Sequence, residues 1–543
     1  MTFIPYRRSR TGVDSRRPAR RRDQRRETGR RQTGSIVTRA IVVGSGMAGL
    51  TVGAYLARDG VQVDVFEQAD HVGGVTTTLR RVGFSWDLGP LLIEGLAPGE
   101  PAGRVLAELG CADRIDLIRA DRGVVFPDYR LQPPDEYIGP YWRRERLKEI
   151  FPDEAEGLDR YYEFYDTMLD LMTLMRRGED AGFLRSLPIK LRMARLFGRV
   201  KRMQDWSSQQ LMDHFFRDER LKALFLGILA DLVVRPSDFA GLAVPALNQE
   251  TAYDRRLPAT AVSIGPRVTF QYVRGGCQSL VDAVASVITG CGGQLHTSSP
   301  VARVVVEHGR ARGIELADGT RHEADLVFVT GGARECFERL VGRDILPPAT
   351  TEHLDDLRLM ESVFMVHLGV DMDVSRHQAG TLDYHLWTYD LEGAIARIQD
   401  GEYHEGRDGF LIYIPSYHSP SMAPDGQHAI TIYTVAPNKL AGSWEERRQE
   451  MTDKLLDCAE EVIPGLREHA RVTVSMTPDD FKRRTHLDHH AFGGVSPVMG
   501  KSGMPHQTPV DGLWFLGSQS ESAGGVANVM LGARAVHKKV RAG

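Results

Sequence analysis

The glycines between residues 44 and 49 have the spacing of a phosphate-binding turn. They form the pattern G-x-G-x-x-G, in which the first glycine permits a tight turn and the second lets the backbone approach a pyrophosphate. The third glycine lets the following helix pack closely on the preceding strand. Unpaired N–H groups at the start of such a helix favour an anion. We therefore expect a dinucleotide pyrophosphate to bind at Gly44, Ser45, Gly46, Met47, Ala48 and Gly49.

The segments around this turn predict a βαβ unit. Residues 39–44 and 61–66 have the apolar, β-rich composition of strands, and residues 47–59 have the pattern of a helix. Glu67 follows the second strand, 23 residues after the first glycine. A carboxylate at this distance accepts hydrogen bonds from a ribose 2′-OH and disfavours a 2′-phosphate. We expect Glu67 and the adjacent Gln68 to contact the dinucleotide.

A second glycine pair, Gly73 and Gly74, follows in a position where NAD-binding units need none. Many flavoproteins use such a pair to pass close to the phosphates of FAD. Here the sequence resembles the flavin amine oxidase and phytoene desaturase superfamily, which usually has Gly-Gly-Arg and then Phe-x-x-Asp-x-Gly-Pro. This chain has valine where that pattern has arginine. The resemblance implies FAD contacts from Gly73, Gly74, Val75, Thr76, Gly89 and Pro90.

The C-terminal segment resembles the closing FAD motif of the same superfamily. Residues 513–516 predict a strand, a glycine-rich loop follows, and residues 526–540 predict a helix. The positive end of that helix would face the pyrimidine side of the flavin, where reduced flavin carries negative charge. The resemblance implies contacts from Gly517, Gly524, Gly525 and Val526.

Shorter matches between these motifs resemble the bacterial phytoene desaturase branch. They include residues 272–276, 415–416 and 423–426. Residues 300–305 are similar to the strand that flanks the adenine in that branch, which implies a cofactor contact from Val304. The branch includes carotene desaturases, carotenoid isomerases and retinol saturases. The resemblance covers almost all of the chain after its N-terminal tail and implies FAD and a lipophilic, carotenoid-like substrate.

The expected fold class is α/β, with an FAD/NAD(P)-binding domain of the three-layer ββα, Rossmann-like type and an inserted α+β substrate domain. A hairpin pattern over residues 301–316, followed by a strand at 324–330, is expected to extend the first sheet. Longer strands at 363–370 and 429–435 suit a separate antiparallel sheet, and residues 140–235 are mostly helical by pattern. We expect the FAD-binding domain to comprise residues 39–115, 268–345 and 480–543, and the substrate domain residues 116–267 and 346–479.

The N-terminal tail differs sharply in charge from the rest of the chain. Residues 1–38 contain twelve arginines and three acidic residues, a charge of +9, so the remaining 505 residues carry −13. Such a segment cannot bury a core and is predicted to be disordered. It is either a binding segment for nucleic acid or anionic lipid, or a dispensable extension upstream of the fold. The acidic body disfavours a nucleic-acid enzyme, and no nucleic-acid partner is expected.

The five cysteines and the hydropathy of the chain bound its chemistry further. None of the cysteines forms a C-x-x-C pair, which excludes the dithiol motif of disulfide reductases and disfavours a zinc site. We expect no metal and a cytoplasmic location. The sequence contains no run of about 18 uncharged apolar residues, so it predicts no membrane-spanning helix. The sequence predicts no particular oligomeric state.

Three histidines before a glycine pair at 493–494 are the candidates for acid–base chemistry. His486, His489 and His490 are close enough in sequence to serve one site. Hydride transfer to flavin requires positioning more than a side-chain catalyst, so such histidines would only assist by moving protons. We take His489 and His490 as the catalytic candidates; the alternative is that they are solvated or structural.

Residues 188–203 combine apolar positions at helical spacing with six basic residues. This pattern is typical of a helix that lies on an anionic membrane surface, and equally of a core-facing helix with a basic outer face. The first interpretation would place the protein peripherally at the inner face of the membrane.

Three functions are compatible with these motifs. The leading hypothesis is hydride transfer to flavin from a lipophilic polyene, in desaturation, saturation or isomerisation. The second is an amine oxidase-like enzyme, which needs an aromatic pair at the flavin, and the third is a non-enzymatic scaffold stabilised by FAD. The aromatic candidates for the second hypothesis are Trp86, Trp387, Tyr413 and Trp514.

Overall fold

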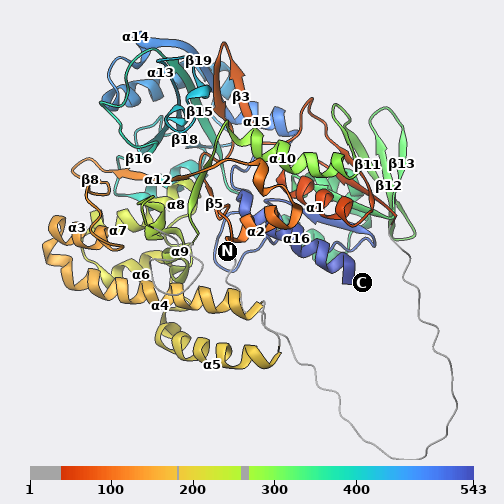
Figure 1. Ribbon diagram of the computed structural model, residues 1–543, viewed down its shortest axis with the longest axis horizontal. Helices are drawn as coiled ribbons and strands as arrows, with labels where there is room; N and C mark the ends of the chain where they lie inside the picture. Colours follow the sequence, from red (N-terminus) through yellow and green to blue (C-terminus); the bar gives the residue numbers. More distant parts are fainter. Residues whose placement is uncertain (1–37, 180–182, 258–267, 543) are drawn as a thin grey trace, which may run out of the picture.

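The computed structural model describes residues 38–179, 183–257 and 268–542 (Figure 1). The tail expected to be disordered lies outside the described residues, except for Thr38. Among the described residues, no helix has both the length and the apolar character needed to cross a membrane.

A five-stranded parallel sheet forms the centre of one half of the molecule. Its strand order is β10-β2-β1-β14-β20, and each neighbouring pair is parallel. The strands predicted at 39–44, 61–66 and 513–516 are confirmed within two residues. The members are β1 (Arg39–Val43), β2 (Gln62–Phe66), β10 (Gln294–His296), β14 (Leu326–Thr330) and β20 (Leu513–Leu516).

The side chains of β1 point alternately to the two faces of this sheet and pack against a different layer on each face. Ala40 and Val42 pack toward the helices on one face, and Ile41 and Val43 pack toward the opposite face. Side chains on a strand alternate between faces, so five residues suffice to build both interfaces. The helices on the first face, visible in Figure 1, are α1 (Met47–Arg58), α2 (Pro101–Leu109), α10 (Cys277–Gly290) and α16 (Val526–Ala542).

The hairpin at 301–316 does not extend the parallel sheet, and that part of the prediction is wrong, whereas the strand predicted at 324–330 joins this sheet as β14. It forms its own antiparallel sheet from β11 (Val301–Glu307), β12 (Arg310–Leu316) and β13 (Arg321–Glu323), packed across the second face. Buried parallel strands are apolar on both faces. The outer side of this hairpin instead carries an ion pair between Arg303 and Glu315. The hairpin therefore packs on the parallel sheet with one face and exposes the other face to solvent. The three-layer ββα fold is confirmed.

The other half of the molecule contains a mixed seven-stranded sheet, in the order β19-β15-β18-β17-β16-β7-β8. Nine residues of β15 (Ser362–Val370) pair antiparallel with nine residues of β18 (His428–Ala436), which confirms the predicted second sheet. Only β16 and β7 pair in parallel. The remaining strands are β7 (Gly123–Val125), β8 (Arg130–Leu131), β16 (Leu382–Leu386), β17 (Gly409–Tyr413) and β19 (Ala470–Met476).

Helices cover both faces of this sheet. Phe364 and Val366 of β15 pack toward α13 (Trp444–Val462), while Val363 and Met365 face a helical layer on the other side. That layer confirms the helical pattern predicted for residues 140–235. It comprises α3 (Trp142–Ile150), α4 (Ala155–Glu179), α5 (Phe183–Val200), α6 (Ser208–Phe215), α7 (Glu219–Leu226) and α8 (Ile228–Asp231).

A small sheet connects the two halves. β9 (Phe270–Val273) pairs with β5 (Ile93–Glu94) on one side and with β6 (Leu117–Ala120) on the other. The chain therefore crosses between the halves several times, and the division into two domains at the expected boundaries stays a prediction.

Candidate cofactor and substrate site

A cavity of about 830 Å³ extends from the parallel sheet to the mixed sheet. At one end it is lined by Val43, Phe66 and Val329, which lie at the carboxyl ends of β1, β2 and β14. Ligands of parallel α/β sheets bind at this edge. At the other end it reaches Tyr384 of β16 and Tyr433 of β18, so one space connects the two halves.

The turn at the start of α1 leaves room for a ligand at its second glycine. A Cβ at Gly46 would meet no atom within 4 Å, whereas a Cβ at Gly49 would lie 2.2 Å from the Gly44 carbonyl oxygen. Gly44 has φ of +94°, a conformation that favours glycine. Each glycine of the pattern thus meets the requirement expected of it: the turn, the open approach and the close packing.

The second glycine pair lies directly against this turn. The Gly73 amide donates to the Ser45 carbonyl at 3.1 Å, and a Cβ at Gly74 would lie 3.5 Å from Gly46 Cα. No side chain caps the start of α1. Its first N–H groups therefore remain available to an anion, which is the arrangement a pyrophosphate requires.

Glu67 lies at the end of β2, beside the turn. Its carboxylate accepts hydrogen bonds from the Ser45 amide at 2.8 Å, the Ser45 hydroxyl at 2.6 Å and the Ala69 amide at 2.9 Å. The side chain is buried and lines the cavity. These contacts hold the turn in shape and orient the carboxylate toward the ligand space.

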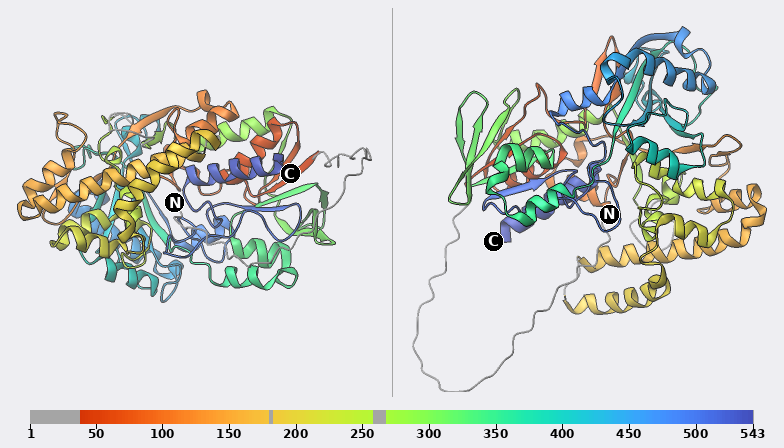
Figure 2. Two further views of the ribbon diagram at one scale, coloured as in Figure 1. Left: turned by 90° about the horizontal axis from the view of Figure 1, so that it is seen from below. Right: turned by 180° about the vertical axis from the view of Figure 1, so that it is seen from behind.

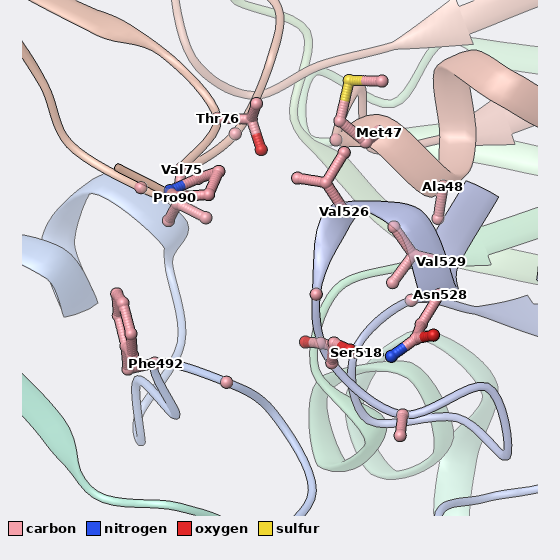
Figure 3. A pocket seen from close by; sticks show the side chains of 18 of the residues that line it. Met47, Ala48, Val75, Thr76, Pro90, Phe492, Ser518, Val526, Asn528 and Val529 are labelled. Atoms are coloured by element: carbon pink, nitrogen blue, oxygen red, sulfur yellow. Dashed lines mark hydrogen bonds between the residues drawn. The ribbon is translucent and has the colours of Figure 1, made fainter. Parts of the chain in front are cut away.

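The start of α16 faces the same space from the opposite end of the chain. Gly525, with φ of +94°, precedes Val526, the first helical residue. A Cβ at Gly524 would lie 1.5 Å from the Gly493 carbonyl oxygen, so the two loops touch through bare backbone. Figure 3 shows Val526 and Val529 on one side of the cavity and Val75, Pro90 and Phe492 on the other.

Most of the residues predicted to bind the cofactor line this one cavity. Ser45, Gly49 and Val304 do not line it. Ser45 and Gly49 shape the turn through contacts with Glu67 and Gly44. Val304 packs between the sheets, while Val301 of the same strand reaches the cavity. The predicted residues that line it are Gly44, Gly46, Met47, Ala48, Glu67, Gln68, Gly73, Gly74, Val75, Thr76, Gly89, Pro90, Gly517, Gly524, Gly525 and Val526.

The cavity also contains residues that sequence reasoning missed. Ser518 follows the predicted Gly517, and Asn528 and Val529 belong to the first turn of α16, so their neighbours in the motif were the available signal. Arg484 comes from a separate segment. Its pKa is lowered by burial, its Nε has no hydrogen-bond partner, and Glu67 lies near enough to act on its charge. No local motif pointed to it.

The three candidate histidines separate in the structure. His486 and His490 line the cavity and His489 does not. His489 Nε2 lies 2.9 Å from the Met360 carbonyl oxygen. His490 is buried and stacks on Phe481, and burial lowers the pKa of its imidazole to about 3. A neutral ring that resists protonation is a poor general base at neutral pH.

The end of the cavity near the mixed sheet is mainly apolar. Its polar groups are few: Arg122, Asp231, Gln249 and the hydroxyls of Tyr384 and Tyr433. The apolar lining consists of Leu232, Phe239, Ala243, Ala246, Leu247, Phe270, Leu382, Leu411 and Phe492. An apolar pocket with a few converging polar groups is typical of a small-molecule site.

Comparison with known proteins decides which dinucleotide fits this site. The model of the family "Flavin containing amine oxidoreductase" matches residues 47–540. The chain belongs to this flavin-containing family. Its cofactor is FAD, and the open position at Gly46, the uncapped start of α1 and the backbone approach at Gly524 fit that group.

Known proteins match this chain along nearly its whole length. A zeta-carotene-forming phytoene desaturase of Myxococcus xanthus is 26% identical and covers 92% of this chain and 93% of its own. A lycopene-forming phytoene desaturase of a Paracoccus species is 25% identical, covering 91% and 95%. An oxidoreductase structure from Methanosarcina mazei has a TM-score of 0.59 at 19% identity, covering 92% and 100%, which supports the fold. The chain is an FAD-dependent oxidoreductase.

Proposed function

We propose that this flavoenzyme oxidises, saturates or isomerises a large lipophilic polyene of the carotenoid type. The observation that carries the proposal is the single cavity, which connects the glycine-lined cofactor end with an apolar chamber at the mixed sheet. Two relatives that match over nearly their full lengths are phytoene desaturases by name. Both facts favour a substrate without a requirement for many polar contacts.

The residues of the chain would act mainly by binding and positioning. The glycine turns and Glu67 would hold the nucleotide, and the start of α16 would stabilise negative charge on the reduced ring. FAD, when bound, supplies the two-electron chemistry. Residues lining the chamber would exclude water and align one carbon–carbon bond of the polyene with the cofactor. His490 would serve as a neutral polar contact rather than as a base.

The proposed cofactor contacts and the proposed domain boundaries are those expected from the sequence. We propose that the residues given above line the FAD site, and that residues 39–115, 268–345 and 480–543 form its domain. The substrate domain would consist of residues 116–267 and 346–479. The chamber residues from β16 and β18 then belong to the second unit, and the glycine turns to the first.

An anaerobic reduction assay tests the proposed substrate class. The holoprotein is mixed with liposomes that contain a polyene such as phytoene, and flavin absorbance near 450 nm and the polyene spectrum are followed together. Flavin bleaching with a red shift of the polyene supports desaturation. In a parallel assay in air, hydrogen peroxide release with amines, together with no response to polyenes, would instead establish the amine oxidase alternative. Flavin that exchanges electrons with no substrate or acceptor would favour a scaffold.

We also propose that α5 contacts a membrane surface. α5 packs along the outside of α4 in Figures 1 and 2, through Met193 and Leu196, which are half-buried. The opposite face has Leu187 and Leu191, 62% and 66% exposed. Ala194 continues this face at helical spacing.

Basic residues flank the exposed apolar face of α5. Lys190, Arg195 and Arg199 are all exposed, and Phe197 is 39% exposed beside them. A helix with an apolar apex and basic flanks suits the interface of an anionic membrane. This location would let a polyene pass from lipid to the chamber.

Liposome flotation tests the membrane contact. Leu187→Glu/Leu191→Glu should abolish flotation with anionic vesicles, while the control Ile345→Glu changes an exposed apolar residue elsewhere, 46% exposed. Both variants should retain FAD. Equal flotation of the wild type and the α5 variant would refute the proposal.

A further inference from the structure

A buried cation lies in the apolar chamber without a carboxylate partner. Arg122, in the loop between β6 and β7, is 7% exposed and lines the cavity. Its Nη2 donates to the Leu247 carbonyl at 2.8 Å and to the Tyr253 hydroxyl at 3.1 Å, and its side chain also forms a hydrogen bond with Tyr384. Its Nε has no partner, and no ion pair of the described residues includes it.

Aromatic rings surround this guanidinium. Its Cζ lies 4.8 Å from the ring centroid of Tyr253, 5.4 Å from that of Phe270 and 5.7 Å from that of Tyr384. Cation–π contacts offset part of the loss of water. They do not neutralise the charge, and an uncompensated buried cation is costly.

The contrast with a neighbouring arginine supports a ligand at Arg122. Arg143 is fully buried, but it forms an ion pair with Glu250 at 3.2 Å. Arg143 therefore has its counter-charge within the protein. Arg122 faces open space instead, in a chamber that the proposed function assigns to a lipophilic molecule.

Asp231, an acidic residue that lines the cavity, forms no ion pair with Arg122. Asp231 lies close enough for Arg122 to act on its charge, but burial raises the pKa of this carboxyl overall, and it forms no ion pair. Its Oδ1 instead accepts a hydrogen bond from the Tyr433 hydroxyl. Burial and the charge of Asp231 raise the pKa of the Tyr384 hydroxyl, while the charge of Arg122 and its hydrogen bond with Tyr384 lower it, so Tyr384 lies near both groups. The chamber thus has a positively charged group, Arg122, at one point of a mainly apolar lining.

We infer that the substrate is a polyene with an anionic, carboxylate-type end, which Arg122 binds. The inference rests on the proposed function, because it concerns one end of the lipophilic molecule in the same chamber. The carboxylate would accept from the guanidinium where Arg122 lines the cavity, while the chain lies along Phe239 and Leu411 toward the cofactor. Arg122 is a substrate-binding residue in this scheme and takes no part in electron transfer.

A matched pair of probes tests the inference by equilibrium binding to the holoprotein. All-trans-retinoic acid is a polyene carboxylate, and its methyl ester has the same chain without the charge. Binding is measured from the perturbation of the flavin spectrum and, independently, by calorimetry. The wild type should bind the acid at least about tenfold more tightly than the ester, since only the acid offers a charged acceptor to the guanidinium.

Variants of the same cluster sharpen the test. Arg122→Met should remove the preference for the acid, Arg122→Lys should retain part of it, and Tyr253→Phe should leave it intact because the cation remains. If Arg122→Met does not fold, the wild-type comparison and the lysine variant decide. Equal binding of acid and ester by the wild type, or a preference that survives in Arg122→Met, would overturn the inference and leave the polyene chamber standing. Binding of neither probe would overturn both this inference and the proposed substrate class.

Discussion

The Glu67 carboxylate accepts hydrogen bonds from both the amide and the hydroxyl of Ser45, at 2.8 and 2.6 Å. The end of β2 is thereby tied to the first turn of the cofactor site, 22 residues earlier in the chain. Glu67 therefore shapes the glycine turn and also faces the ligand space. A residue with both functions affects cofactor binding more than either contact alone would suggest.

Replacement of Glu67 by alanine should weaken FAD binding by about tenfold or more, because two hydrogen bonds to the turn and one acceptor for the ribose are lost. Glu67→Gln should lose less, since its amide oxygen can still accept from Ser45. The dissociation constant is measured by quenching of FAD fluorescence on addition to apoprotein. Glu323→Gln, on the exposed strand β13, is the control. Unchanged affinity in the alanine variant would show that Glu67 does not contact the nucleotide.

Gly46 and Gly49 should respond differently to a side chain. Gly46→Val places its carbons in open space at the start of α1, so the apoprotein should keep its thermal stability but lose bound FAD. Gly49→Ala would bring Cβ to 2.2 Å from the Gly44 carbonyl oxygen, so its apoprotein should unfold at a lower temperature. Thermal unfolding of the apoproteins and the ratio of absorbance at 450 and 280 nm separate the two effects. A yellow Gly46→Val protein would contradict the position of the pyrophosphate.

Sequence patterns predict the local features of this protein well. The strand, turn and helix at residues 39–59 depend on neighbours in the chain, and so do β20 and the start of α16. The pattern at residues 301–316 indicates a hairpin but not the sheet it belongs to, because strand pairing depends on contacts distant in sequence. Its alternating charges, which face solvent in β11 and β12, were the overlooked signal.

The polar groups of the cavity were harder to predict for the same reason. Arg484 meets Glu67 from a segment more than 400 residues away, and Arg122 lies in a short loop between two strands. Neither belongs to a motif, and both reach the cavity only because folding brings distant segments together. His489 and His490 are adjacent in sequence but differ in whether they reach the cavity. Sequence proximity alone could not separate them.

Arg484 should compensate for the arginine that Val75 replaces. It lines the cavity on the cofactor side, where a guanidinium can bind a phosphate oxygen, and its buried Nε has no hydrogen-bond partner. Arg484→Met should weaken FAD binding by about tenfold, and Arg484→Lys by less, because the positive charge remains. The affinity of Arg484→Met should also depend less on salt concentration. Arg483→Met, an exposed neighbour, is the control. Equal affinity and salt dependence in the two methionine variants would exclude a phosphate contact.

Asp87 should make the protein less stable as the pH rises. Its Oδ1 accepts from the Thr78 hydroxyl at 2.8 Å and from the Cys277 amide at the start of α10, at 2.7 Å. Burial nevertheless raises the pKa of this carboxyl from 3.8 to about 6, and its Oδ2 has no partner. Between these two pKa values the folded protein binds the proton more tightly than the unfolded chain. Stability from this group is therefore present at low pH and is lost as the pH rises toward about 6.

Asp87→Asn should remove this pH dependence while it keeps an acceptor for both hydrogen bonds. The variant should gain stability relative to the wild type between pH 4.5 and 7.5, by up to roughly 3 kcal/mol from the difference in pKa. Thermal unfolding of both apoproteins across this range measures the effect as a widening gap in melting temperature. Asp318→Asn, in an exposed turn, should show no such gap. If the melting temperatures of wild type and Asp87→Asn stay parallel from pH 4.5 to 7.5, then Asp87 either remains ionised in the fold throughout or is reached by solvent, and the burial argument fails.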